Sequence, residues 1–213
     1  MKVITLVNQK GGCGKSTVVI NLALSLALAG SRVILLDTDP QRSSFDTIKV
    51  RKRPLIHAIA TYKNLYQILE KCKSRYEYVI IDTPPHIAEV VSTAILCSDI
   101  AIIPVQDSPL DIRSTKTTVD LIRKAKGLNP ELMVYFLLSR IQPRTVLAKE
   151  LSEVLQQRYN INVLKSYISN RVAYKHSLIY GKTVSEISNK DPATREIAFL
   201  VNEIKGLLHE VSE

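Results

Sequence analysis

The stretch KVITLVNQKGGCGKST, residues 2–17, joins a β-branched apolar run directly to a glycine-rich turn. Such a run predicts a buried strand, and the residues from Lys15 onward continue as a helical pattern to residue 29. The usual phosphate-binding pattern between a strand and a helix is G-x-x-x-x-G-K-[ST]. This chain keeps the second half of the pattern, but Gln9 replaces the first glycine and Lys10 follows it. We therefore predict a phosphate-binding turn that carries a second lysine.

The glycine-rich turn has the residue types that a triphosphate requires. Its glycines allow the backbone to curve closely around phosphates, and the helix N-terminus that follows offers unpaired N–H groups. Lys15 is expected to place its charge on the β and γ oxygens, Ser16 to hold Mg²⁺, and Thr17 to reach toward the α-phosphate. The residues predicted to contact the nucleotide are Gly11, Gly12, Cys13, Gly14, Lys15, Ser16 and Thr17.

Acidic residues follow two of the other apolar runs. Asp82 ends the run YVIID, and Asp37 and Asp39 lie in LLDTDPQ. The carboxyl ends of strands meet at the ligand-binding edge of a doubly wound sheet, so we expect these carboxylates near the phosphates. Acids at such a place repel a triphosphate unless they serve a cation or a water. Asp82 is therefore predicted to hold Mg²⁺, and Asp37 and Asp39 to serve the metal or a water.

The rest of the chain alternates short β-branched runs with helical patterns. This alternation predicts an α/β fold, with a doubly wound, mostly parallel sheet, helices on both faces, and a single domain over residues 1–213. The predicted strands are 2–7, 32–37, 78–82, 100–105, 132–139 and 162–168. The predicted helices are 15–29, 62–75, 87–97, 111–126, 145–158 and one that begins at Pro192 with Asp191 as its N-cap.

Composition narrows the class of protein. No apolar run reaches the roughly 18–20 residues that span a bilayer, and we expect no signal peptide before the first strand. Cys13, Cys72 and Cys97 are too few and too widely spaced for a disulfide framework or a metal knuckle, which fits a reducing cytoplasm. The 29 Lys and Arg exceed the 20 Asp and Glu, and the net charge of +9 favours nucleic acid or an acidic membrane as partner.

Four motifs, in this order, resemble those of the ParA family of partitioning ATPases. They are NQKGGCGKST, LLDTDPQ, YVIIDTPP and IPVQDSPLD, and the similarity extends from Met1 at least to the GKTV that begins at Gly181. The ParA family belongs to the deviant Walker A P-loop NTPases, a group that includes MinD, and a chain this short is similar to the small ParA type. The resemblance implies a Mg²⁺-dependent ATPase that is slow until a partner stimulates it.

The resemblance also implies roles for single residues. Lys10 matches the signature lysine, which crosses the interface of an ATP-bound homodimer and contacts the phosphates of the other subunit. A buried triphosphate carries about four negative charges, and burying them requires cations from both sides. Lys10 and Lys15 would stabilise the transferred phosphoryl, Asp39 would orient the attacking water, and Asp37 would support the metal shell. Asp82 would hold Mg²⁺ through a water.

Three positions match the family pattern less well. Asp107 stands where relatives often have proline, and Arg140 lies in LLSRIQPRT, where relatives contact the base. Cys13 occupies a variable position of the loop. It is either a small residue that is tolerated there or a reactive thiol whose pKa the helix N-terminus lowers.

The carboxyl end bears on the choice between DNA and membrane. A MinD-like protein ends in a basic amphipathic helix, whereas the polar face here carries Glu196, Glu203, Glu210 and Glu213 against Arg195 and Lys205. Its apolar stripe is therefore predicted to pack in the core, and no membrane partner is expected. The stripe comprises Ile197, Leu200, Val201, Ile204, Leu207, Leu208 and Val211. Basic residues that match the DNA-binding region of ParA-like proteins precede this helix; they are Arg171, Lys175 and Lys182.

These observations lead to one expected function and three alternatives. We expect a cytoplasmic, nucleoid-associated ATPase that dimerises with ATP, binds non-specific DNA and segregates or positions a plasmid or chromosome centromere complex. A ParB-like or other centromere-binding protein would stimulate hydrolysis. The alternatives are a positioning ATPase for a non-DNA cargo, a MinD-like membrane-cycling regulator, and a metabolic P-loop enzyme of the cobyrinic acid synthase type.

Overall fold

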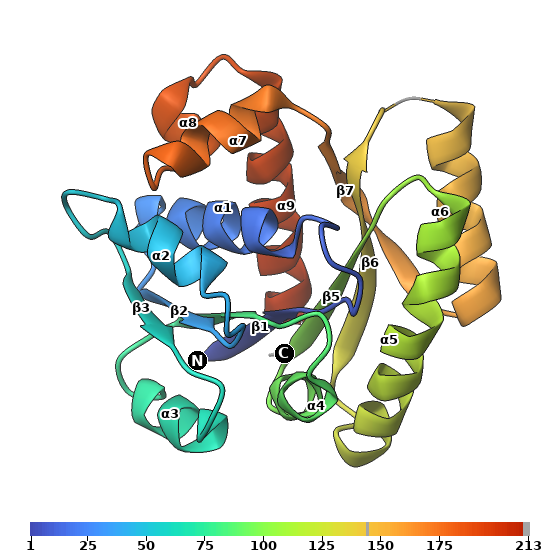
Figure 1. Ribbon diagram of the computed structural model, residues 1–213, viewed down its shortest axis with the longest axis horizontal. Coiled ribbons are helices and arrows are strands. Elements are labelled where there is room, and N and C mark those ends of the chain that lie inside the picture. The colour runs from blue at the N-terminus through green and yellow to red at the C-terminus, as the bar shows by residue number, and fades with distance from the viewer. Residues whose placement is uncertain (144, 211–213) are drawn as a thin grey trace.

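The computed structural model describes the backbone of residues 1–143 and 145–210, and the side chains of these except 109–113 and 210. A seven-stranded sheet in the order β3-β2-β4-β1-β5-β6-β7 forms its centre, and all pairings described are parallel (Figure 1). The strands are β1 (Lys2–Leu6), β2 (Val33–Asp37), β3 (His57–Ala60), β4 (Tyr78–Asp82), β5 (Ile100–Val105), β6 (Met133–Ile141) and β7 (Asn162–Ser169). The predicted doubly wound parallel sheet is therefore confirmed.

Helices follow most of the strands and cover both faces of the sheet (Figure 1). The helices are α1 (Lys15–Leu28), α2 (Ser43–Lys49), α3 (Leu65–Cys72), α4 (Ala88–Leu96), α5 (Pro109–Leu128), α6 (Val146–Tyr159), α7 (Val172–Ile179), α8 (Val184–Ile187) and α9 (Pro192–Glu210). The last helix begins as predicted, because the carboxylate of Asp191 accepts a hydrogen bond from the N–H of Ala193 at 2.8 Å.

The sequence patterns missed the short elements. The strand β3 has four residues that alternate between exposed and half-buried, because it lies at the edge of the sheet. The helices α2, α7 and α8 were not predicted either; they have seven, eight and four residues, which is short for an apolar period to be recognised. These elements were overlooked for the same physical reason, since little of their surface is buried and their sequences carry a weak apolar pattern.

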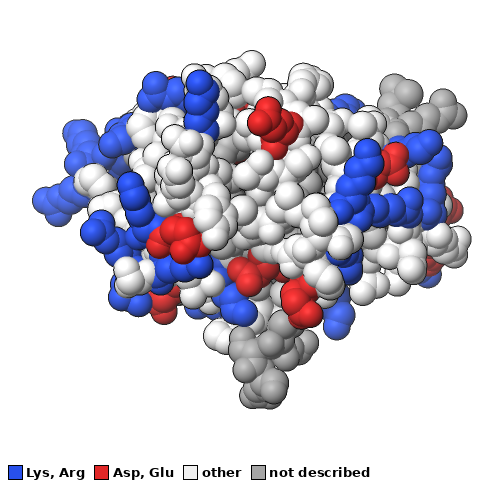
Figure 2. All heavy atoms as spheres, turned by 90° about the horizontal axis from the view of Figure 1, so that it is seen from below, with Lys and Arg blue, Asp and Glu red and all other residues white. Residues whose placement is uncertain are grey.

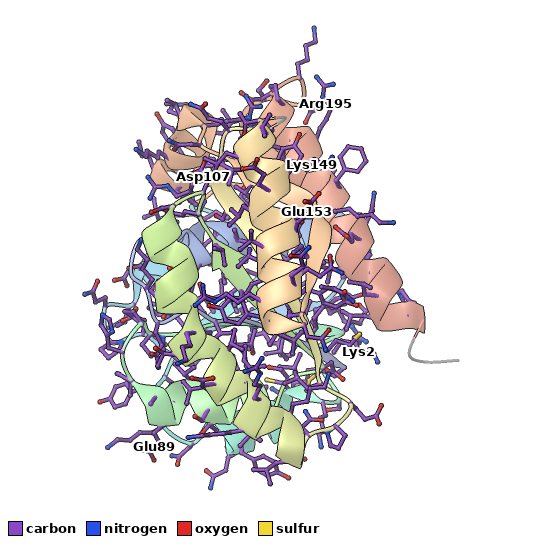
Figure 3. All side chains as sticks on the ribbon, turned by 90° about the vertical axis from the view of Figure 1, so that its right-hand side faces the viewer. Lys2, Glu89, Asp107, Lys149, Glu153 and Arg195 are labelled. Atoms are coloured by element: carbon purple, nitrogen blue, oxygen red, sulfur yellow. The ribbon has the colours of Figure 1, made fainter. Side chains whose placement is uncertain are left out.

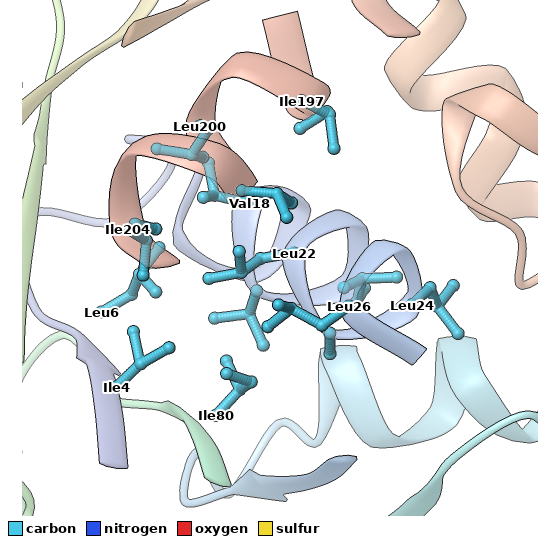
Figure 4. Close-up of a cluster of buried hydrophobic side chains, with 14 of the residues drawn as sticks. Ile4, Leu6, Val18, Leu22, Leu24, Leu26, Ile80, Ile197, Leu200 and Ile204 are labelled. Carbon is cyan, nitrogen blue, oxygen red and sulfur yellow. The ribbon is translucent and has the colours of Figure 1, made fainter. Parts of the chain in front are cut away.

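Two apolar layers hold the helices against the sheet. On one face, Ile4, Leu6 and Ile80 pack against α1 and α9 (Figure 4). On the other face, Ala101 and Ile103 pack against α4, α5 and α6. Strands buried on both faces read as continuous apolar runs, which is why the patterns located these strands correctly.

The apolar stripe of α9 lies in the core, as predicted. Ile197, Leu200 and Ile204 are at most 2% exposed and lie beside Leu22 of α1 (Figure 4). Val201 and Leu208 are buried as well, Leu207 packs at the margin, and Val211 lies outside the described residues. Across the chain that the structure describes, no helix has the length and apolar character needed to cross a bilayer.

Glu196 and Glu203 lie on the polar face of α9, as predicted, but their carboxylates bind the edge strand β7. Glu196 is only 7% exposed, and its carboxylate accepts hydrogen bonds from the N–H and the hydroxyl of Ser169 at 2.9 and 2.7 Å. Glu203 accepts the N–H groups of Lys165 and Ser166 at 2.7 and 2.8 Å. Because β7 is an edge strand, its outer N–H groups need partners, and these two carboxylates supply them.

Leu200→Ala is expected to lower the free energy of unfolding by about 2–5 kcal/mol, because it removes a fully buried side chain between two helices and the sheet. The matched control is Leu128→Ala, since Leu128 is 79% exposed. That variant should change stability by less than about 0.5 kcal/mol. Urea denaturation of both variants measures the difference, and equal stabilities would contradict the placement of α9 in the core.

Candidate nucleotide-binding site

The phosphate loop joins β1 to α1 and depends on its last glycine. Gly14 is the N-cap residue of α1, and its φ of 95° lies in the left-handed region. A Cβ atom at this position would lie 2.7 Å from the hydroxyl of Ser139. Only glycine therefore fits here, for reasons of both backbone conformation and space.

A cavity of about 590 Å³ opens beside this loop. It is lined by residues from five segments that are far apart in the sequence, namely the loop with the start of α1, the turn after β2, the segment after β4, the end of β6 and the stretch from the end of β7 into α7. The predicted site residues that line it are Gly11, Gly12, Gly14, Lys15, Ser16, Thr17, Asp39, Arg171 and Lys175. Lys10, Cys13, Asp37, Asp82 and Lys182 are not among the lining residues.

The side chain of Lys15 is folded into the loop. It is 8% exposed, and its Nζ donates hydrogen bonds to the carbonyl oxygens of Asn8 at 2.9 Å and Lys10 at 3.3 Å. These neutral acceptors hold the ammonium group at the edge of the cavity. An anionic phosphate oxygen is a stronger acceptor, so a bound phosphate would draw this charge toward itself.

Two side chains from other elements hold the loop at Gly12. Its carbonyl oxygen accepts hydrogen bonds from Nε2 of Gln106 at 2.8 Å and from Nη1 of Arg140 at 2.9 Å. Arg140 reaches the loop from a left-handed backbone conformation, with a φ of 57°. Gln106 was not among the predicted site residues. Arg140 contacts the loop and also lines the cavity, and its contact with the base stays a prediction.

The start of the loop has its own anchors, which the sequence analysis also missed. Nδ2 of Asn8 donates to the carbonyl of Pro104 at 2.7 Å, and Oδ1 of Asn8 accepts from the N–H of Lys10 at 2.9 Å. The N–H of Gln9 donates to the hydroxyl of Thr118 at 3.1 Å. Pro104 and Thr118 lie 96 and 109 residues away from Asn8 and Gln9 in the chain. Only a structure brings them together.

Asp82 has a buried carboxylate that lacks a partner. It is 1% exposed, and neither of its oxygens has a hydrogen-bond partner within the described residues. Burial raises the pKa of Asp82 to about 7, although the nearby hydroxyls of Ser16 and Ser44 and the charge of Lys15 oppose that rise. Buried carboxylates without a partner are rare, and a divalent cation would satisfy this one. Asp82 and Ser16 together therefore fit a Mg²⁺ site.

Asp37 organises the turn that carries Asp39. Its Oδ2 accepts hydrogen bonds from the N–H and the hydroxyl of Ser44 at 2.9 and 2.7 Å and from the N–H of Phe45 at 2.9 Å. Among the described residues, its Oδ1 accepts the N–H of Asp39 alone, at 3.0 Å. Asp37 thus satisfies the N-terminus of α2 and leaves Oδ1 with room for one more donor, such as a metal-bound water.

Asp39 is the acid that faces the cavity. It is half-buried, and its Oδ1 accepts a hydrogen bond from the N–H of Gln41 at 2.9 Å. The turn that holds it is fixed by Asp37, so the carboxylate has a defined place beside the phosphate loop. A carboxylate in this position is suited to orient a water near a terminal phosphate.

The structure decides between the two readings of Cys13. The thiol is 1% exposed and donates to the carbonyl oxygen of Lys10 at 3.3 Å. Burial raises the pKa of the Cys13 thiol, and this outweighs the opposing charge of Lys15. The alternative of a reactive, low-pKa thiol is therefore wrong, and Cys13 acts as a small residue that fits under the loop.

The three predicted DNA-binding residues differ in their surroundings. Arg171 forms an ion pair with Glu196, with 2.8 Å between Nε and Oε1, and this hydrogen bond raises its pKa. Lys175 is exposed on α7, and Lys182 is half-buried after it. The face opposite α7 carries its lysines and arginines at two sides, with a mostly uncharged area between them (Figure 2). On that face, charge does not gather into one patch.

Comparison with known proteins places the chain among nucleotide-binding relatives. The family model described as the CobQ/CobB/MinD/ParA nucleotide binding domain matches residues 4–184. The maintenance of carboxysome distribution protein A of Halothiobacillus neapolitanus is 26% identical over 209 residues, which cover 94% of this chain and 95% of that protein.

Solved structures share the fold. A putative plasmid partition protein from Borrelia burgdorferi bound to AMPPNP superposes with a TM-score of 0.74 at 22% identity, covering 96% of this chain and 98% of the other. The septum site-determining protein MinD of Pyrococcus horikoshii, complexed with Mg-ADP, gives a TM-score of 0.75 at 17% identity, with 97% of each chain covered.

Gly14→Ala is expected to lower the free energy of unfolding by about 1–3 kcal/mol, because it combines a left-handed backbone conformation with the contact to Ser139. The matched control is Gly11→Ala, since a Cβ there would meet nothing within 4 Å. That variant should stay within about 0.5 kcal/mol of wild type. Thermal unfolding without nucleotide measures both, and equal losses would argue against the strained geometry at Gly14.

Proposed function

The chain belongs to the CobQ/CobB/MinD/ParA family of nucleotide-binding proteins, and we propose that it is an ATP-dependent dimerising ATPase that positions a cargo on DNA. The ATP-bound homodimer binds DNA without regard to sequence, and the cargo is a plasmid or chromosome centromere complex. A ParB-like or other centromere-binding protein stimulates hydrolysis and so releases the dimer. The observation that supports this most is the shared cavity of phosphate loop and Asp39 next to the unpartnered carboxylate of Asp82.

The cofactors of the proposed reaction are ATP and Mg²⁺. The loop glycines and the N-terminus of α1 would hold the phosphates, with Lys15 adding a positive charge. Ser16 and Asp82 would hold Mg²⁺, with Asp37 behind them. When bound, Mg²⁺ neutralises the charge that develops on the β and γ oxygens.

Asp37 and Asp39, at the end of β2 and in the turn after it, would have different roles in hydrolysis. Asp39 would orient the attacking water, since it faces the cavity and is half-exposed. Asp37 would position Asp39, because it holds the N–H of that residue and the start of α2. Phosphoryl transfer depends mainly on positioning and electrostatics, so neither carboxylate needs to be a strong base.

Lys10 would join the two subunits of the dimer. Its backbone is fixed on both sides, because its N–H donates to Asn8 and its carbonyl accepts from Lys15 and Cys13. The side chain therefore starts from a defined point at the beginning of the loop. We place its ammonium group across the interface, on the phosphates of the other subunit, where it would offset the charge of a buried triphosphate.

The proposed DNA surface lies around α7. Lys175 is exposed there, and Lys182 follows the helix. Arg171 already shares its charge with Glu196, so we assign the larger part of the phosphate contacts to the two lysines. Contacts of this kind give affinity without reading sequence and weaken as salt rises.

Two observations bear on the alternatives. The likeness to the carboxysome distribution protein favours, as second candidate, a positioning ATPase whose cargo is a protein assembly rather than DNA. A MinD-like membrane cycle is less well supported, because the apolar stripe of α9 is used in the core. Under the first proposal the protein acts in the cytoplasm, on the nucleoid.

The two lysines of the loop separate nucleotide binding from dimer formation. Lys15→Ala should lose ATP binding, because the charge beside the phosphates is removed. Lys10→Ala should keep ATP binding and stay monomeric with ATP, because the cation that crosses the interface is missing. Isothermal titration measures binding and light scattering measures mass, with Lys71→Ala on α3 as a control that should dimerise normally. A Lys10→Ala variant that dimerises like wild type would refute the proposed role.

A further inference from the structure

A second cavity, of about 790 Å³, runs along the edge of the sheet between β7 and α9. Apolar and aromatic residues from three segments line it, among them Pro143, Tyr167 and Phe199. Figure 3 faces this side of the molecule and labels Arg195 near the start of α9. We call this cavity the β7–α9 groove. No residue of the phosphate loop lines it.

The groove does not offer its strand edge to another strand. The register between β6 and β7 shifts between Phe136 and Leu138, which pair with Val163 and Tyr167. The N–H groups of Lys165 and Ser166 lie in this bulge and donate to Glu203. A partner strand would have to displace that carboxylate, so the groove is suited to receive side chains rather than a backbone.

The acids of the groove point inward and accept hydrogen bonds, whereas two of the three basic residues that line it are exposed. The carboxylate of Glu196 accepts from Ser169, Arg171 and the hydroxyl of Tyr174, the last at 2.8 Å. Lys165 and Arg195 are exposed and form no ion pair within the described part of the chain. The rim of the groove therefore presents positive charge that has no counter-ion among the residues that the structure describes.

Phe199 gives the groove an apolar anchor. Its side chain is 69% exposed, although its neighbour Leu200 on α9 is fully buried. An exposed aromatic ring beside a tyrosine and a proline is typical of a protein-binding surface, where such residues contribute most of the affinity. DNA phosphates need cations but not an apolar ring in a hollow, so this lining favours a peptide over a duplex.

We propose that the β7–α9 groove binds a short acidic segment of a partner protein. An apolar side chain of that segment packs against Phe199 and Tyr167, and its carboxylates pair with Lys165 and Arg195. The groove adjoins the nucleotide cavity, because Arg171 lines both of them. A partner held here lies next to the nucleotide, yet the inference does not depend on the proposed ATPase cycle, because binding is measured without nucleotide.

The first test selects peptides from a random twelve-residue phage library on the wild-type protein. Counter-selection uses the double variant Phe199→Ala/Arg195→Glu, which alters two exposed side chains and should fold normally. The expected result is enrichment of acidic peptides with an aromatic or large aliphatic residue. Peptides that are basic, or that bind wild type and double variant equally, would overturn the proposal.

The second test measures the affinity of one enriched peptide, labelled with fluorescein, by fluorescence polarisation. Phe199→Ala and Arg195→Glu should each weaken binding at least about tenfold, because each removes one of the two contacts. The matched controls are Leu128→Ala and Lys124→Glu, exposed residues on α5 outside the groove, which should bind like wild type. If the two groove variants instead lose retention on random-sequence DNA and leave the peptide affinity unchanged, the groove is a DNA surface and the proposal fails.

Discussion

The parallel register of β1, β4 and β2 is the constraint on which the site depends. Leu6 pairs with Asp82, and Asp82 pairs with Asp37, so three strands end at one level. That level places the phosphate loop, the buried carboxylate and the turn with Asp39 around one cavity. A slip in this register would separate the groups that a triphosphate and its cation need together, which makes the sheet itself part of the binding site.

Burial of the Asp82 carboxylate opposes folding until a cation arrives. The protein keeps both oxygens of this carboxylate without a partner, and among the described residues the hydroxyl of Ser139 is the one other buried side-chain oxygen that lacks a hydrogen bond. Asp37 shows the contrast, because the same residue type in the next strand accepts four hydrogen bonds and fixes α2. Two acids at one edge thus have different roles, one organising the turn and one left open for a ligand.

The sequence predicted the parts of the site that lie in continuous motifs. The phosphate loop, Asp82 and the turn with Asp39 could be found because each follows an apolar run that is buried on both faces. The side chains that anchor the loop could not be found in this way, since Gln106 reaches Gly12 from the end of β5 and Arg140 from β6. The amphipathic pattern placed Glu196 on the polar face of α9 but could not show that this carboxylate is buried against the edge strand β7. The ion pair of Arg171 with Glu196 was not predicted for the same reason.

We propose that ATP controls the binding of this protein to DNA, and one paired sedimentation assay distinguishes this from the alternatives. The protein is pelleted with random-sequence DNA or with anionic liposomes, each with ATP, ADP or no nucleotide, at two salt concentrations. We expect the protein to be retained on DNA only with ATP, and less at the higher salt concentration. We expect no retention on liposomes. Retention on liposomes alone, or on DNA regardless of nucleotide, would contradict it.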